Sequence, residues 1–182
     1  REPAAPAAWS GVRLANHYAP ACYQAEAKPF GPYTAEFLAS GPFSEDCLYL
    51  NVWTPKRPAA TGKWPVLVFI HGGAFLGGAA SVPVYDGARL AARGAVIVTI
   101  NYRANVFGLL AHPGLTAESP LGTSGNYGLL DQIAALQWVQ RNIARFGGDT
   151  MNVTLSGESA GAASVNDLIV SPLAKGLFQK AI

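Results

Sequence analysis

Charged residues are scarce in this chain. Asp, Glu, Lys and Arg make up only 13% of its 182 residues, whereas roughly 25% is usual for globular chains. Because half of the residues are hydrophobic, the low charge predicts that much of this segment lies at the centre of a larger sheet. The net charge of +2 comes from scattered residues without a basic run. This argues against nucleic acid and anionic membrane surfaces as partners.

Long hydrophobic runs, internal repeats and low-complexity linkers are also lacking. No apolar run reaches the roughly 18 residues that a membrane span needs, and no segment has the pattern of a signal peptide. A trimmed chain would lack a signal as well, so this absence leaves the compartment open. Nothing in the pattern calls for a metal or a cofactor.

Ser159 stands in the pentapeptide Gly157-Glu158-Ser159-Ala160-Gly161, after an apolar β-type run and before a small-residue helix start. This pattern is typical of a nucleophile elbow, a tight strand-to-helix turn that presents a serine hydroxyl at the helix N-terminus. The flanking positions need glycine because a Cβ there would strike the strand or the helix. The alternative is a glycine-rich turn with a bystander serine.

A second motif, His71-Gly72-Gly73-Ala74-Phe75, follows the apolar run 66–70. Attack on an ester carbonyl builds negative charge on oxygen, which backbone N–H groups in a low-dielectric pocket stabilise by about 3–4 kcal/mol each. The amides of Gly73, Ala74 and Ala160 would form such an oxyanion hole. Taken alone, this loop could equally be a structural turn, but its pairing with Ser159 favours the functional interpretation.

Apolar runs alternate with helical patterns along the chain, which predicts a mostly parallel α/β sheet. The unbroken run 66–70 is typical of a strand that is buried on both faces. Asp86 can cap a short helix that Gly94 closes. The expected strands cover 48–53, 66–70, 95–100 and 152–155. The expected helices are the short one from its cap at Asp86 to residue 93 and a longer one over 129–145.

Five stretches of the sequence are SEDCLYLNVW at 44–53, HGGAF at 71–75, GNYGLLDQ at 125–132, FGGD at 146–149 and GESAGA at 157–162. In this order they resemble the type-B carboxylesterases, the carboxylesterase and cholinesterase family of α/β-hydrolases. The similarity runs from about Trp9 to Ile182. Ala74 departs from it, since many members have a third glycine there, but an alanine keeps its N–H.

The resemblance implies an α/β-hydrolase fold, a mostly parallel central sheet flanked by helices that is incomplete in this chain. Residues 1–182 would be part of a single catalytic domain, without the first strands and the C-terminal part. The strand before His71 would lie beside the strand before Ser159, and residues 176–182 would begin the next strand. Expressed alone, such a piece is expected neither to fold stably nor to hydrolyse esters, because its cut sheet edge invites aggregation.

The catalytic triad of this fold follows the order Ser, acid, His, yet no histidine follows Ser159. All three histidines, His17, His71 and His112, precede it, and His71 is expected to be a packed strut. Asp167 lies on the helix that the elbow begins and should point away from Ser159. The triad acid and histidine are therefore expected in the missing part, which could be a second chain.

Relatives also suggest roles for four other residues. A Glu at the position of Glu158 sits behind the catalytic His in relatives, with a Tyr nearby that corresponds to Tyr85; the alternative is a buried acid with structural bonds only. Cys22 and Cys47 match a loop that relatives close with a disulfide, which would favour a secreted or periplasmic protein. Two reduced thiols in a cytoplasmic esterase are the alternative.

The sequence thus predicts a serine carboxylic-ester hydrolase that works through an acyl-enzyme on a small-molecule ester. One alternative is a non-catalytic adhesion-type member that keeps the fold, although an intact Ser159 argues against it. A lipase or amidase variant is another. In cholinesterases the loop between the two cysteines presents a Trp to quaternary ammonium groups. Here the loop has Phe30, Tyr33 and Phe37 but no Trp, and this speaks against choline selectivity.

Overall fold

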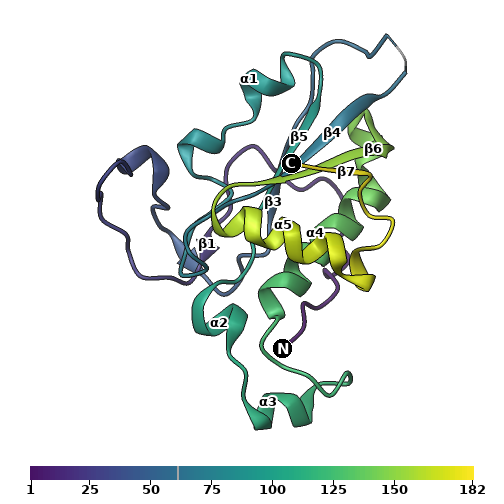
Figure 1. Ribbon diagram of the computed structural model, residues 1–182. Helices are drawn as coiled ribbons and strands as arrows, with labels where there is room; N and C mark the ends of the chain where they lie inside the picture. The colour runs from purple at the N-terminus through teal and green to yellow at the C-terminus, as the bar shows by residue number, and fades with distance from the viewer. Residues whose placement is uncertain (61) are drawn as a thin grey trace.

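A five-stranded sheet forms the centre of the molecule (Figure 1). The computed structural model describes residues 1–60 and 62–182. The strand order is β3-β5-β4-β6-β7, and every neighbouring pair is parallel except β3 with β5. The mostly parallel α/β sheet is thereby confirmed. Its strands are β3 Leu50–Trp53, β4 Trp64–Ile70, β5 Val96–Ile100, β6 Gly148–Gly157 and β7 Lys180–Ala181.

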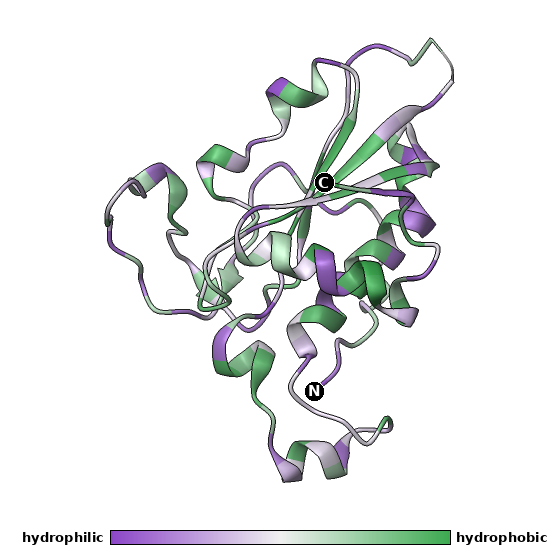
Figure 2. Cartoon of the chain, in the orientation of Figure 1, coloured by the Kyte–Doolittle hydropathy of each residue, from purple (hydrophilic) through white to green (hydrophobic). Residues whose placement is uncertain are grey.

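Two longer helices, α4 (Tyr127–Asn142) and α5 (Ala160–Val170), cover one face of this sheet. Alternate strand residues point into this layer, because side chains along a strand face opposite sides in turn. They form one buried core with Leu136, Val139 and Leu168 from the helices. In Figure 2 the hydrophobic colour runs along much of β4 and β5 and also marks parts of the helices. The core residues of the strands are Val66, Val68, Ile70, Val96, Val98, Ile100, Val153 and Leu155.

Short elements surround this core. A separate parallel pair joins β1 (Ala21–Cys22) to β2 (Phe43–Ser44). The other elements are helices α1 Ala88–Ala91, α2 Asn105–Leu109 and α3 Pro113–Glu118, and 3₁₀ turns η1 Ala35–Phe37, η2 Pro83–Tyr85, η3 Ile143–Phe146 and η4 Pro172–Ala174.

The expected strands and helices are present with other bounds: β3 begins only at Leu50, β6 is longer than expected, and α1 is shorter. Two further differences concern the type of helix and the burial of a strand. The helix expected over 129–145 is α helix only to Asn142 and then tightens into η3, whose C-cap Gly147 has a φ of 80°. Strand β4 is fully buried only at alternate residues, since Leu67 and Phe69 on its second face are half-buried. The second face of β4 is thinly covered, and Phe69 packs there on the ring of Tyr85. By contrast, every residue of β5 is buried.

An ion pair ties the loop after β5 to helix α4. The guanidinium of Arg103 donates two hydrogen bonds of 2.7 and 2.8 Å to the carboxylate of Asp131, and the backbone N–H of Arg103 donates a third of 3.0 Å. The carboxylate of Asp131 is fully buried. A buried charge is tolerated only when it is paired and hydrogen-bonded in this way.

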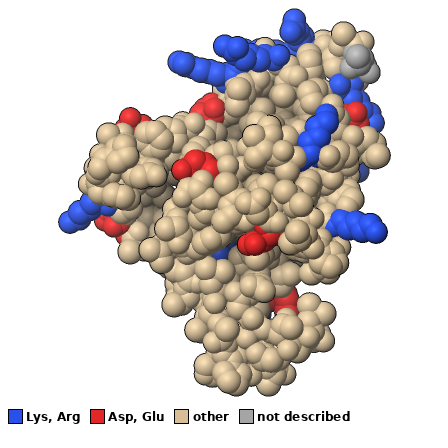
Figure 3. All heavy atoms as spheres, in the orientation of Figure 1, with Lys and Arg blue, Asp and Glu red and all other residues tan. Residues whose placement is uncertain are grey.

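Charges are sparse on the surface as well. On the face drawn in Figure 3, lysine and arginine side chains gather toward the top and right margins, and most of the remaining surface is uncharged. Within residues 1–60 and 62–182, no helix combines the length and the apolar character that crossing a bilayer requires.

Replacing Asp131 with alanine should lower the free energy of unfolding of the native protein by about 2–3 kcal/mol, because the half-buried Arg103 would lose its charged partner and three hydrogen bonds. Urea unfolding monitored by fluorescence measures this. The matched control is Asp167→Ala on α5, where the acid is exposed and the change should stay within about 0.5 kcal/mol. Equal effects of the two substitutions would contradict a structural role for the ion pair.

Candidate active site

Ser159 occupies a strained turn between β6 and α5. It is the N-cap of α5, with φ 54° and ψ −119°, and its side chain is exposed. A Cβ at Gly157 would overlap the backbone of Gly161, and a Cβ at Gly161 would overlap the carbonyl oxygen of Ile70. Both glycines are therefore required by space. This is the geometry of the predicted nucleophile elbow.

The end of β4 lies directly beside this turn. Strands β4 and β6 pair in parallel with Ile70 opposite Gly157, so both strands end at the same edge of the sheet. A Cβ built on Gly72 would lie 3.0 Å from the Cβ of Ser159. The expected neighbourhood of the two motifs is thus present, and residues after Ile70 border the serine.

The loop after Gly72 turns repeatedly through left-handed backbone conformations. The φ angles are 110° at Gly73, 54° at Ala74 and 57° at Phe75. Gly73 and Ala74 are exposed. Among the described residues, no hydrogen bond uses the amide of Gly73, Ala74 or Ala160 as its donor. In the described part of the chain these three amides thus have no acceptor, and their role in an oxyanion hole stays a prediction.

His71 is a buried strut beneath this loop. Its ring stacks on Tyr102 at a centroid distance of 4.4 Å, and its Nδ1–H donates to the carbonyl oxygen of Gly72 at 2.8 Å. Tyr102 in turn donates to the carbonyl oxygen of His71 at 2.9 Å. Burial lowers the pKa of His71 to about 4. A neutral ring without contact to the serine fits the predicted structural role.

The other candidate triad residues lie elsewhere. His17 is exposed and contacts Asn16, and His112 caps α3 by accepting from the amide of Gly114. Asp167 is an exposed residue of α5. In the part of the chain that the structure describes, none of these side chains is bonded to Ser159.

Glu158 and Tyr85 face each other beside the turn. The hydroxyl of Tyr85 donates to Oε2 of Glu158 over a long 3.5 Å, and the carboxylate lies against Gly72. Burial, aided by the charge of Glu158, raises the pKa of Tyr85 to about 12. Glu158 is exposed in the described residues, so the structure differs here from the alternative of a buried acid. Its predicted place behind a catalytic histidine stays a prediction.

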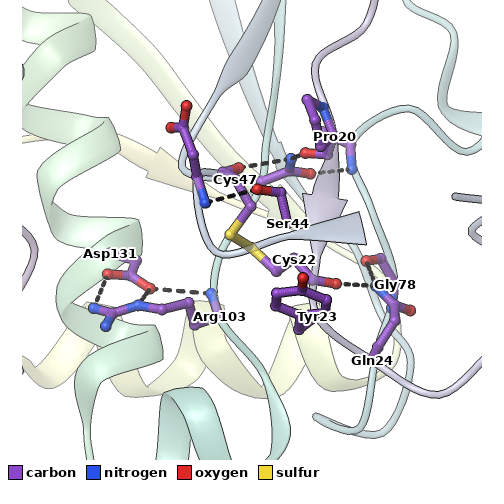
Figure 4. Close-up of a disulfide and its surroundings, with 12 residues drawn as sticks. Pro20, Cys22, Tyr23, Gln24, Ser44, Cys47, Gly78, Arg103 and Asp131 are labelled. Atoms are coloured by element: carbon purple, nitrogen blue, oxygen red, sulfur yellow. Dashed lines mark hydrogen bonds and ion pairs between the residues drawn. A yellow bond between two sulfur atoms is a disulfide. The ribbon is translucent and has the colours of Figure 1, made fainter. Parts of the chain in front are cut away.

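Cys22 and Cys47 form a disulfide across 25 positions of the sequence, as the resemblance implies (Figure 4). Asn101, directly after β5, joins three backbone segments around this crosslink. Its Nδ2 donates to the carbonyl oxygens of Cys47 and Pro20 at 2.9 and 3.2 Å, and its Oδ1 accepts from the amide of Ala80 at 2.8 Å.

Asn101 was not predicted from the sequence, nor were Gln24 and Asn105, which bond to the loop that carries Gly73 and Ala74. A signal for the two asparagines existed. Both follow the carboxyl end of a parallel strand, where sites in α/β sheets gather. Among the described residues, no group of three or more His, Cys, Asp or Glu side chains could hold a metal ion.

The model of the carboxylesterase family matches residues 1–182. The chain belongs to the carboxylesterase family. It is 50% identical over its whole length to fumonisin B1 esterase of Sphingopyxis macrogoltabida and covers 32% of that protein. It is 49% identical to para-nitrobenzyl esterase of Bacillus subtilis and covers 35% of it. A medium-chain fatty acyl-CoA hydrolase precursor of Anas platyrhynchos is 48% identical, with 32% covered.

A solved structure of a PNB esterase superposes on this family member with a TM-score of 0.77 and 47% identity. The match covers 91% of this chain and 32% of that chain, and the α/β-hydrolase fold is thereby confirmed. The chain spans about a third of the length of the curated relatives it matches.

His71 makes stability depend on pH. Its pKa is about 4 in the folded protein, below its ordinary value of 6.5, so between these values the unfolded chain binds a proton that the native protein does not. The free energy of unfolding should fall by about 1.4 kcal/mol per pH unit as pH decreases from 6.5 toward 4.

Urea unfolding at pH 7, 6 and 5 measures the slope. His71→Asn should flatten it, whereas the control His17→Asn, at an exposed position, should leave it unchanged. A slope that survives in His71→Asn would show that another group is responsible.

Proposed function

We propose that this chain carries the nucleophile and the oxyanion hole of a serine carboxylic-ester hydrolase. The observation that supports this most is the position of Ser159 in a strained elbow, next to a loop with unused amides. Membership of the carboxylesterase family supports the same reaction class. The site residues are Ser159 as nucleophile, the amides of Gly73, Ala74 and Ala160 as oxyanion donors, and Glu158 and Tyr85 as supporting groups.

The proposed reaction has two halves. Oγ of Ser159 attacks the carbonyl carbon and gives its proton to a base, while the carbonyl oxygen becomes an oxyanion that accepts from the three amides. Collapse of this intermediate breaks the bond to the alcohol oxygen, which leaves with a proton. Water then attacks the acyl-enzyme by the same route and releases the carboxylic acid.

The base of this reaction comes from outside residues 1–182 in our proposal. The contacts of His17, His71 and His112 do not include Ser159 among the described residues, and burial keeps the His71 ring neutral. The relatives are about three times as long as this chain. We therefore assign residues 1–182 to a single catalytic domain whose remaining part supplies an acid followed by a histidine, in the order typical of this fold.

The substrate class in this proposal is a small-molecule carboxylic ester. Relatives are named for the hydrolysis of a fumonisin, of para-nitrobenzyl esters and of fatty acyl-CoA, all of them acyl compounds. The intact serine and loop favour a catalytic protein over an adhesion-type member of the fold. No cofactor enters the reaction as proposed.

We place the protein in an oxidising compartment, secreted or periplasmic. The support is the disulfide between Cys22 and Cys47, both buried, because such bonds persist in these compartments and are rare in the cytosol. On the loop-entropy model the crosslink stabilises the fold by about 3–4 kcal/mol.

In the complete enzyme, Ser159→Ala should abolish covalent labelling by a fluorophosphonate and lower ester turnover by several powers of ten, since no acyl-enzyme can form. Labelling is read by mass spectrometry and turnover with p-nitrophenyl acetate. The control Ser156→Ala removes a hydroxyl from β6 and should keep both signals. Near-normal turnover in Ser159→Ala would refute the assignment.

A further inference from the structure

The loop that carries Gly73 and Ala74 is held in a conformation that it would not keep unaided. Ala74 and Phe75 both have left-handed φ angles, a region that is unfavourable for residues with a Cβ. Among the described residues, the amides of Leu76 and Gly77 are the only ones that bond back within the loop, both to the carbonyl oxygen of Gly73. Strain of this kind persists only where surrounding contacts fix it.

Asn105 supplies contacts at the middle of the loop. Its backbone amide donates to the carbonyl oxygen of Phe75 at 2.7 Å, and its Nδ2 donates to those of Leu76 and Tyr23 at 3.3 and 2.9 Å. Its Oδ1 accepts from the amide of Phe107 at 3.1 Å. Asn105 itself has a φ of 50°, which asparagine tolerates better than most residues.

Gln24 supplies contacts at the far end of the loop. Its Oε1 accepts from the amide of Gly78 at 2.7 Å, and its Nε2 donates to the carbonyl oxygens of Gly78 and Cys22 at 2.8 and 3.0 Å (Figure 4). The side chain thus pairs with both backbone groups of Gly78, as a neighbouring strand would. Gly77 approaches it so closely that a Cβ there would overlap Oε1 of Gln24.

Both contacts lead back to one crosslinked segment. Asn105 bonds to Tyr23, and Gln24 bonds to Cys22, whose sulfur is joined to Cys47. Cys47 is in turn fixed by Asn101. We propose that Gln24 and Asn105 are positioning residues, which hold the loop 72–78 against the segment 22–24 so that the amides of Gly73 and Ala74 face the carbonyl attacked by Ser159.

This inference rests on the proposed esterase function. An oxyanion hole acts on the transition state more than on the bound substrate, so a displaced donor lowers kcat and leaves KM nearly unchanged. A residue that only stabilises the fold would instead lower the melting temperature and the number of active sites, without changing kcat per site.

The test uses the complete enzyme with sites counted by fluorophosphonate labelling. Asn105→Gly permits the φ of 50° and the backbone bond to Phe75 but removes both side-chain donors. Asn105→Asp keeps the acceptor for Phe107 and also loses the donors, so it serves if the glycine variant does not fold. Gln24→Glu keeps the oxygen that accepts from the amide of Gly78 but replaces the Nε2 donor with a carboxylate oxygen, so the bonds to the carbonyl oxygens of Gly78 and Cys22 are lost.

Each variant should lower kcat per labelled site roughly ten-fold, since complete loss of one donor costs about 10²–10³, with KM within about two-fold. The inhibition constant of a trifluoromethyl ketone, which forms a hemiketal oxyanion on the serine, should rise by a similar factor. The matched control is Gln140→Glu, because Gln140 also joins two backbone carbonyls, of Thr150 and Leu177, on different elements. It should lower the melting temperature and leave kcat and the inhibition constant unchanged.

Wild-type kcat and wild-type ketone affinity in the folded variants would overturn the positioning role. Losses that follow only the count of labelled sites, as in Gln140→Glu, would do the same. Failure of the wild-type enzyme to label or to turn over esters would instead refute the proposed function itself.

Discussion

The parallel pairing of β4 with β6 is the constraint on which the site depends. Ile70 stands opposite Gly157, so the two strands end side by side. β4 leads to Gly73 and Ala74, and β6 leads to Ser159. A slip of one residue would turn every side chain of the strand to the other face and expose its buried set. The core residues Val66, Val68 and Val153 therefore fix the position of the loop that carries Gly73 and Ala74 relative to Ser159.

Close backbone contact is the second element of this arrangement. Helix α5 begins so near the end of β4 that Gly161 has no room for a Cβ beside the carbonyl oxygen of Ile70. The turn at Ser159 and the loop at Ala74 are both strained, and strain of this kind is typical of functional sites. The cost is carried by neighbours that are themselves firmly held: the disulfide-linked segment 22–24, the buried ring of His71, and the sheet.

Much of the fold could be predicted from the sequence because its signals are local. Apolar runs marked β4 and β5, and glycines with fixed steric roles marked the elbow. The half-buried second face of β4 could not be read from the run alone, since Leu67 and Phe69 are as apolar as their buried neighbours. Likewise, the 3₁₀ end of the helix at residues 143–146 depends on Gly147 and Gly148 leading into β6.

The candidate site was only partly predictable for a different reason. Ser159 and the glycines at 72 and 73 belong to contiguous motifs. By contrast, Gln24 contacts Gly78, which is 54 positions away in the sequence, and Asn105 contacts Tyr23, which is 82 positions away. Such contacts depend on the tertiary structure. The disulfide followed from the family resemblance and not from spacing, since two cysteines alone do not establish a bond.

A crystal structure of the complete enzyme with a trifluoromethyl ketone bound tests the central claim most directly. The account predicts a covalent bond from Oγ of Ser159 to the ketone carbon, with the hemiketal oxygen about 2.7–3.1 Å from the amide nitrogens of Gly73, Ala74 and Ala160. An adduct on another residue, or a hemiketal oxygen that points away from these three amides, would contradict it.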